Sequence, residues 1–173
     1  MPSTEKGKRC SCESRLRFIA DGMVGRLARW LRLIGNDVEY SRDLTDEELI
    51  RNAIAEARIL LTSDVELYRR AIADGAEAYL VKGRTEAERL ARISKRFGID
   101  LNVDTANSRC PTCNAPIRPV EKDQVKGKVP SSTFEVFNEF WECTNSKCGK
   151  IYWQGSHWKK IGEHLSRAER LAV

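Results

Sequence analysis

The chain has 173 residues, of which 41% are hydrophobic and 32% charged, and its 30 Lys and Arg against 25 Asp and Glu give a formal net charge of +5. It contains no apolar run of about 18 residues, which excludes a membrane-spanning helix, and residues 1–13 lack the apolar segment of a secretory signal. We therefore expect a cytoplasmic protein, in which six cysteines favour metal ligation over disulfide bonds.

The positive charge is concentrated at the two ends of the chain. Residues 1–15 hold four Lys and Arg against two Asp and Glu, residues 16–104 hold fifteen against sixteen, and residues 105–173 hold eleven against seven. A basic appendage suits a polyanion such as nucleic acid. Residues 1–14 have few large apolar side chains and predict a flexible basic tail, in which Cys10 and Cys12 are expected to be bystanders.

Hydrophobic periodicity over residues 16–97 predicts four strands that alternate with four helices. The strands are expected at residues 16–20, 37–40, 59–61 and 78–81, and the helices at residues 23–34, 45–57, 65–73 and 85–97. Thr45 with Glu48, and Thr85 with Glu88, match the capping-box pattern of a helix start. This alternation predicts an α/β fold in which right-handed crossovers place helices on both faces of a parallel sheet.

Beyond residue 100 the alternation ends. Residues 102–107 are expected to form a linker, and a segment that contains cysteine, proline and aromatic residues runs from there to about residue 158. A short helix near residues 159–171 is expected to close the chain.

Four cysteines have the spacing of a zinc ribbon. Cys110 and Cys113 form a C-x2-C knuckle, Cys143 and Cys148 form a C-x4-C knuckle, and 29 residues separate the two pairs. Zinc takes four thiolate or imidazole ligands in a tetrahedron, and a full set of protein ligands leaves no open position for water, so this zinc is expected to be structural. His157 is a rival ligand for one cysteine, and the loop between the pairs, residues 114–142, which is rich in aromatics at residues 135–142, is expected to form the hairpin of the ribbon.

Aspartates follow the first three predicted strands. Asp21 follows the first strand, Asp43 and Asp46 follow the second, and Asp64 follows the third. Because ligands bind where parallel strands end, these carboxylates are expected to hold Mg²⁺ or Mn²⁺ and to be catalytic. Helix capping explains each aspartate alone at least as well, but it explains less readily why three successive junctions use Asp.

Basic and aromatic residues form two candidate surfaces for nucleic acid. Arg26, Arg29 and Arg32 recur every three residues on the helix after Asp21. Because they lie beside the predicted acid cluster, their guanidinium groups are expected to bind phosphates of a nucleic acid. Around the ribbon, basic groups interleave with rings on which bases stack, and the candidates are Lys126, Lys128, Lys150, Trp153, His157 and Trp158. The alternatives are a solvated helix face for the arginines and a small ribbon core made by Tyr152 and Trp153, with one of this pair buried.

Several segments resemble a known family. FIADGMVGRLARWLR at residues 18–32, ILLTSD at residues 59–64 and the pair Asp43 and Asp46 resemble the PIN-like RNase family named after the Mut-seven exonuclease C-terminal domain. RCPTCN at residues 109–114 and CGKIYWQGSH at residues 148–157 match its ribbon, so the resemblance covers about residues 16–160. The C-x4-C knuckle departs from the C-x2-C that is usual in this family.

The resemblance implies a PIN-like parallel sheet flanked by helices, with a small C-terminal zinc ribbon. The chain would comprise a basic tail at residues 1–14, a PIN-like nuclease domain at 15–104, a zinc ribbon at 105–158 and a C-terminal helix at 159–173. It also implies metal-dependent RNA cleavage, with the family's acids carried by Asp21, Asp43, Asp46 and Asp64.

These observations predict an endoribonuclease with catalytic Mg²⁺ or Mn²⁺ and structural Zn²⁺, in which the ribbon assists RNA binding. Its expected partner is RNA, with ribosomal RNA or a ribosomal subunit among the candidates, and no membrane. The alternative is a non-catalytic RNA- or ribosome-binding factor whose acids only cap helices. A nucleotide-binding domain is disfavoured, because neither G-x-G-x-x-G nor G-x4-G-K-[ST] occurs.

Overall fold

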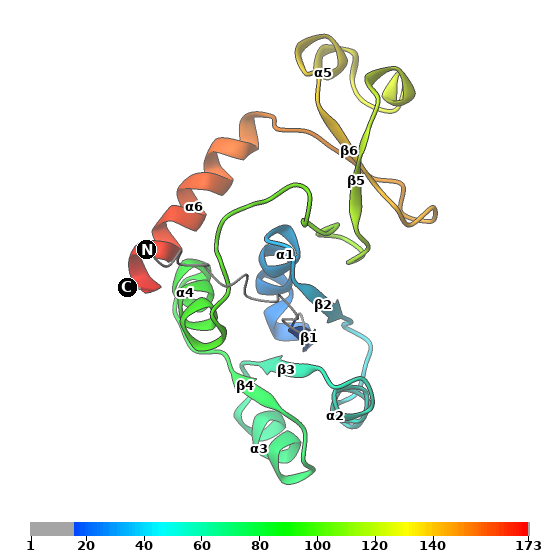
Figure 1. The fold of residues 1–173 in the computed structure, drawn as a ribbon. Helices are drawn as coiled ribbons and strands as arrows, with labels where there is room; N and C mark the ends of the chain where they lie inside the picture. Colours follow the sequence, from blue (N-terminus) through cyan, green and yellow to red (C-terminus); the bar gives the residue numbers. More distant parts are fainter. Residues whose placement is uncertain (1–15, 173) are drawn as a thin grey trace, which may run out of the picture.

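Residues 18–20 and 59–62, in two neighbouring strands, are buried on both faces, as the centre of a parallel sheet between two helix layers requires. The computed structural model describes residues 16–172 (Figure 1). Four parallel strands pair in the order β2-β1-β3-β4, and their bounds are Arg17–Ala20 for β1, Asp37–Tyr40 for β2, Ile59–Thr62 for β3 and Ala78–Leu80 for β4. The predicted α/β fold is confirmed.

Two helix layers cover this sheet, and each layer has its own apolar core. The helices are α1 (Gly25–Leu33), α2 (Asp46–Ala55), α3 (Val65–Ala73) and α4 (Glu86–Phe97), and a 3-10 turn, η1 (Gly22–Val24), precedes α1. Phe18 and Leu61 point into the core shared with α1 and α4, whereas Ile19 and Leu60 point into the core shared with α2 and α3. This alternation is the two-residue period of a strand.

The helix starts follow the capping signals of the sequence. Thr45 and Glu48 form the complete capping box at α2. At α4 the Thr85 hydroxyl accepts the backbone N–H of Glu88, but the Glu88 carboxylate turns to the backbone N–H of Arg84. Only half of the second predicted box is therefore formed.

A small antiparallel sheet carries the cysteine-rich half. Its strands, in the order β5-β6-β7, are β5 (Ile117–Val120), β6 (Phe140–Cys143) and β7 (Ile151–Tyr152), with η2 (Lys122–Val125) and α5 (Ser131–Val136) between β5 and β6. The expectation that the loop between the cysteine pairs forms an antiparallel hairpin is confirmed, since β5 pairs with β6, although α5 reaches into the start of the aromatic stretch at residues 135–142. Pro130, with φ −56°, is already suited to a helix start.

The C-terminal helix returns from the ribbon to the parallel sheet. Helix α6 (Ser156–Ala172) begins earlier than predicted and lies along α4 (Figure 1). Leu165 and Ala168 of α6 are buried in the core of α1 and α4. Trp30 of α1 stacks on His164 of α6, with ring centroids 4.3 Å apart, and this contact helps to pack α6 against α1.

A buried arginine fastens the first cysteine knuckle to the parallel sheet. Arg32 is 4% exposed, and its guanidinium donates to the carbonyls of Val38, Pro111 and Thr112 at 2.8, 3.1 and 3.1 Å. Desolvation lowers the pKa of Arg32, and the nearby Cys110 and Cys113 oppose that shift. One side chain thus joins α1, the end strand β2 and the knuckle.

The side chain of Asn114 makes a second connection. Its Oδ1 accepts the backbone N–H of Val38 at 3.0 Å and its Nδ2 donates to Asp37 at 2.7 Å. Asn114 has φ +69°, a conformation that Asn tolerates better than most residues, directly after Cys113. Because β2 is an edge strand, Asn114 satisfies a backbone donor that would otherwise face solvent.

The predicted domain boundaries at residues 15–104, 105–158 and 159–173 stay predictions, and the tail at residues 1–14 lies outside the described residues. Between residues 16 and 172, no helix combines the length and apolar character needed to cross a membrane.

The hydrogen bonds of Arg32 to β2 and to the knuckle, which we call the Arg32 clamp, are expected to stabilise the fold. Arg32→Met removes the guanidinium and leaves three carbonyls without their donor, so we expect it to lower the free energy of unfolding by about 3 kcal/mol. Arg29→Met on the exposed face of the same helix is expected to stay within about 0.5 kcal/mol of the original protein. Urea unfolding of the zinc-loaded proteins measures both, and equal effects of the two substitutions would refute the clamp.

Candidate active site and metal centre

The sulfur atoms of the four ribbon cysteines lie close enough together to bind one metal ion. Their Sγ atoms all lie within 4.8 Å of one another, with 3.7 Å between Cys110 and Cys148 and 3.3 Å between Cys113 and Cys143. Four sulfurs at the usual zinc distance of about 2.3 Å would lie about 3.8 Å apart in a tetrahedron. The cluster therefore fits a zinc ion, and the exposed His157 is not part of it.

Hydrogen bonds to Cys110 favour its ionised form. Burial opposes ionisation of this thiol, but bonds from the Tyr152 hydroxyl and the backbone amides of Cys113 and Thr112 outweigh it and lower the pKa to about 7. The Tyr152 oxygen lies 3.0 Å from the sulfur. Burial is the main cause that raises the pKa of Cys143 and of Cys148. A bound cation would bring these two thiols into the thiolate form that metal ligation requires.

At the carboxyl end of the parallel sheet, a hydroxyl joins two of the predicted aspartates. Asp21 follows β1, is 4% exposed, and its Oδ2 accepts the hydroxyl of Thr62 from the end of neighbouring β3. The same Thr62 oxygen accepts the backbone N–H of Asp64 at 2.9 Å. Because β1 lies between β2 and β3, Asp21 occupies the middle of this edge.

Both aspartates also cap helices. Oδ1 of Asp21 accepts the backbone N–H groups of Met23 and Val24, and Oδ1 of Asp64 accepts those of Glu66 and Leu67. The capping interpretation is therefore correct for these two residues. It uses only one oxygen of Asp64, and no described group donates to its second oxygen, which faces the exposed edge.

The other two aspartates lie beyond β2. Asp43 is exposed in the loop before α2, and Asp46 in the first turn of α2 pairs with Arg70 of α3 at 3.1 Å. Within residues 16–172, the cysteine cluster is the one group of three or more His, Cys, Asp or Glu side chains whose ligand atoms converge. The structure thus joins Asp21 to Asp64, and the shared metal site of all four aspartates stays a prediction.

A cavity lined by arginines lies beside the turn that follows Asp21, although Asp21 itself does not line it. It measures about 410 Å³, begins at Gly22 and Met23, and is lined by Arg26, Arg29, Arg42 and Arg89 together with Gly25, Tyr40 and Glu86. The sequence arguments missed Arg42 and Arg89. Arg42 donates to the Tyr40 hydroxyl at 2.9 Å and Arg89 to Glu86 at 3.0 Å. Gly25 admits the Tyr40 ring, since an added Cβ would stand 2.5 Å from it.

Several predicted RNA-binding residues lie elsewhere. Arg32 is not on a solvated face, because its guanidinium is the buried clamp between α1 and the knuckle. Lys128 pairs with Glu142 at 3.6 Å and Lys150 donates to Thr112 at 3.1 Å, whereas Lys126 is exposed.

The ribbon aromatics do not divide into one buried and one available ring. Tyr152 and Trp153 are both partly exposed, and both line an apolar cavity of about 220 Å³ to which Trp158 also belongs. Trp141 is the tryptophan that the fold buries beside them.

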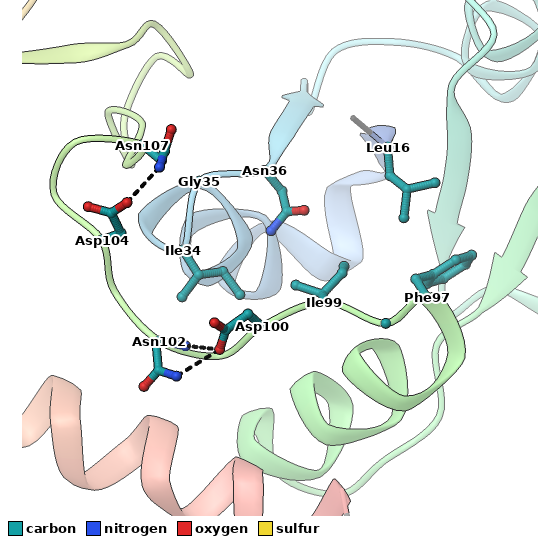
Figure 2. A pocket seen from close by; sticks show the side chains of 11 residues that line it. Leu16, Ile34, Gly35, Asn36, Phe97, Ile99, Asp100, Asn102, Asp104 and Asn107 are labelled. Carbon is teal, nitrogen blue, oxygen red and sulfur yellow. Dashed lines mark hydrogen bonds between the residues drawn. The ribbon is translucent and has the colours of Figure 1, made fainter. Parts of the chain in front are cut away.

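A larger cavity lies at the opposite end of the sheet. It measures about 740 Å³ and is lined by Leu16, which precedes β1, by Asn36, which precedes β2, and by residues of the linker (Figure 2). Its two acids are already bonded, since Asp100 accepts from Asn102 at 2.8 Å and Asp104 from Asn107 at 2.5 Å. This cavity is therefore a weaker candidate for a metal site than the edge at Asp21.

Comparison with known families agrees with this arrangement. The Mut7-C RNase domain matches residues 16–165, which include the parallel sheet, the cysteine cluster and most of α6. Comparison with curated proteins and with solved structures gives no match. The match covers most of the chain, and the protein belongs to the Mut7-C RNase domain family.

Proposed function

We propose that the chain is a divalent-metal-dependent endoribonuclease whose reaction takes place at the Asp21 edge of the parallel sheet. The observation that carries the proposal is the bond from Thr62 to Asp21, which ties the acids after β1 and β3 together beside an arginine-lined cavity. This pairing of charges suits a metal-dependent ribonuclease, because anionic oxygens hold a cation and guanidinium groups hold the phosphates.

Each side chain at this edge has a separate task. Asp21 is held rigid by three donors, so it offers a fixed negative charge at the floor of the site. Asp64 presents its second oxygen from the end of the neighbouring strand, and Asp43 adds an exposed carboxylate from the loop after β2. Arg26 and Arg29 orient the phosphodiester.

Carboxylate oxygens are the ligands that Mg²⁺ and Mn²⁺ prefer, so Asp21, Asp64 and Asp43 are the proposed donors, with Asp46 as a fourth once it leaves Arg70. A divalent cation there would lower the pKa of a bound water and neutralise charge on the phosphate in the transition state.

We assign the zinc of the cysteine cluster a structural role. All four positions are taken by Cys110, Cys113, Cys143 and Cys148, so no site remains for substrate or water. Zinc would fix the knuckle that Arg32 and Asn114 attach to the parallel sheet. Lys126, His157 and the neighbouring lysines would then add a basic surface for RNA, whose identity, ribosomal or other, is not fixed by these residues.

Replacing the joined aspartates tests the catalytic proposal. Asp21→Asn/Asp64→Asn keeps the caps but removes two charges, and we expect cleavage of a mixed single-stranded and structured RNA in Mn²⁺ to fall by at least about 10²–10³-fold. Asp74→Asn, at the exposed end of α3, is the matched control and is expected to cleave normally. Undiminished cleavage by the double variant would exclude this mechanism, and RNA binding without any cleavage by the original protein would favour a binding factor.

The Thr62 hydroxyl provides a finer test. Thr62→Val has the same shape and fills the same buried space, but it leaves Asp21 without a donor that orients it. We expect kcat to fall roughly 10- to 100-fold, in line with the loss of a second-layer partner of a metal ligand, and Thr62→Ser to recover most of it. If Val and Ser variants have the same kcat, the hydroxyl does not position Asp21.

Metal analysis tests the ribbon. We expect one zinc per chain by atomic absorption, and Cys113→Ser to lose most of it in competition with a chelator, since three thiolates hold zinc less tightly than four. Cys10→Ser/Cys12→Ser serves as the control and should retain the full zinc content. Loss of zinc from this control, with retention by Cys113→Ser, would mean that the ligand set is wrong.

A further inference from the structure

Three cavities that share lining residues follow one another from the turn after Asp21 to the ribbon. The arginine-lined cavity shares Arg26 and Arg29 with a second cavity of about 360 Å³ over α1. That second cavity shares Leu33, Pro111 and Ile161 with the apolar cavity of about 220 Å³ beneath the ribbon and α6. We call this line of cavities the α1 groove.

We propose that the α1 groove binds single-stranded RNA, with an unpaired nucleobase in its apolar end and the adjoining phosphates on Arg26 and Arg29. The inference rests on the proposed ribonuclease function and specifies its substrate class. The groove would deliver an unpaired strand to the Asp21 edge, which adjoins its cationic end.

The apolar end has the lining and size that suit one base. Its walls carry Trp141, Tyr152, Trp153 and Trp158, together with aliphatic and proline carbons. At about 220 Å³ it is smaller than the roughly 300–1,000 Å³ of pockets for drug-sized ligands, so it fits a single ring system. Aromatic side chains bind bases of any sequence by stacking, since every base has a π-face.

The position of one of these rings is fixed by a glycine. An added Cβ at Gly155 would stand 2.8 Å from Nε1 of Trp153, so the indole lies directly on the backbone there. The opposite wall is equally constrained, because Pro111 belongs to the knuckle that Arg32 clamps. The pocket is therefore built from both halves of the chain and held at a fixed position relative to α1.

The cationic part has charges that the protein itself does not neutralise. Arg26 and Arg29 are exposed, and in the described part of the chain no ion pair or hydrogen bond holds either guanidinium. Arg32 on the same helix shows the contrast, since all of its described bonds go to backbone carbonyls. Two unpaired guanidinium groups that line two adjoining cavities complement the phosphates of a strand that follows the groove.

A duplex does not satisfy this geometry. A base in a helix is stacked on both faces and paired on its edge, so it enters an enclosed pocket only after it leaves the stack. The groove thus selects RNA loops, bulges and single strands. The aromatic pocket binds one unpaired base at a fixed distance from the phosphodiester that is cleaved.

Binding without catalysis tests the inference. The probe is a short single-stranded RNA that carries 2-aminopurine, compared with the same RNA annealed to its complement. The zinc-loaded full chain is titrated without added Mg²⁺ or Mn²⁺, and fluorescence anisotropy and 2-aminopurine emission are recorded. We expect preference for the single strand and quenching of 2-aminopurine on binding.

Two sets of variants separate stacking from charge. Trp158→Ala is expected to weaken binding roughly 5- to 100-fold and to remove the quenching, whereas Trp158→Phe and the ribbon control Phe134→Ala retain both. Thr105→Trp, which fills the pocket and leaves Trp158 in place, is expected to act like Trp158→Ala.

The charge variants change a different quantity. Arg26→Gln/Arg29→Gln is expected to lower the slope of log K against log salt by about 1.4, while Arg51→Gln/Arg69→Gln, on α2 and α3, leaves it unchanged. The tryptophan variants lower affinity with no change in this slope.

The outcomes distinguish the two proposals. Single-strand binding with quenching that Trp158→Ala and Thr105→Trp remove supports the groove, whether or not the RNA is cleaved when Mn²⁺ is added. Equal affinity for the duplex, or pocket variants that bind like the original protein, overturns it. If the groove fails in this way and Asp21→Asn/Asp64→Asn still abolishes cleavage, the ribonuclease proposal stands alone.

Discussion

The buried guanidinium of Arg32 is the interaction on which the arrangement of the two halves depends. It donates to β2 on one side and to the knuckle carbonyls of Pro111 and Thr112 on the other. Asn114 adds two hydrogen bonds to the same edge strand. A ribbon attached only by the linker would sample many orientations, whereas these contacts fix it beside α1. The α1 groove exists only because the ribbon is held there.

The carboxyl edge of the sheet combines stability with chemistry. Asp21 uses one oxygen to cap the turn before α1 and the other to accept the Thr62 hydroxyl. Capping and metal binding are therefore not exclusive interpretations, since a carboxylate that is fixed by helix amides is also preorganised for a cation. In the proposed function, Arg26 and Arg29 would bind the phosphates of the RNA that approaches that edge.

Much of this was accessible from the sequence because it follows from local periodicity. The strand and helix order, the complete capping box at Thr45 and the cysteine spacing are local patterns with direct physical causes. The role of Arg32 was not accessible, because its partners in the knuckle are about 80 residues away in the sequence. Its spacing of three residues from Arg29 suggested instead that both arginines share one exposed helix face. Thr62 was missed since a hydroxyl at a strand end gives no sign of its partner, and the aromatic content near α5 gave no indication of a helix.

The proposed function requires that the edge around Asp21 binds a divalent cation separately from zinc at the cysteine cluster. The most direct test is an electron paramagnetic resonance titration of the zinc-loaded protein with Mn²⁺, compared with Asp21→Asn/Asp64→Asn. The account predicts saturable Mn²⁺ binding that the double variant loses while its zinc content stays unchanged. Equal Mn²⁺ binding by both proteins, or none by either, would contradict it.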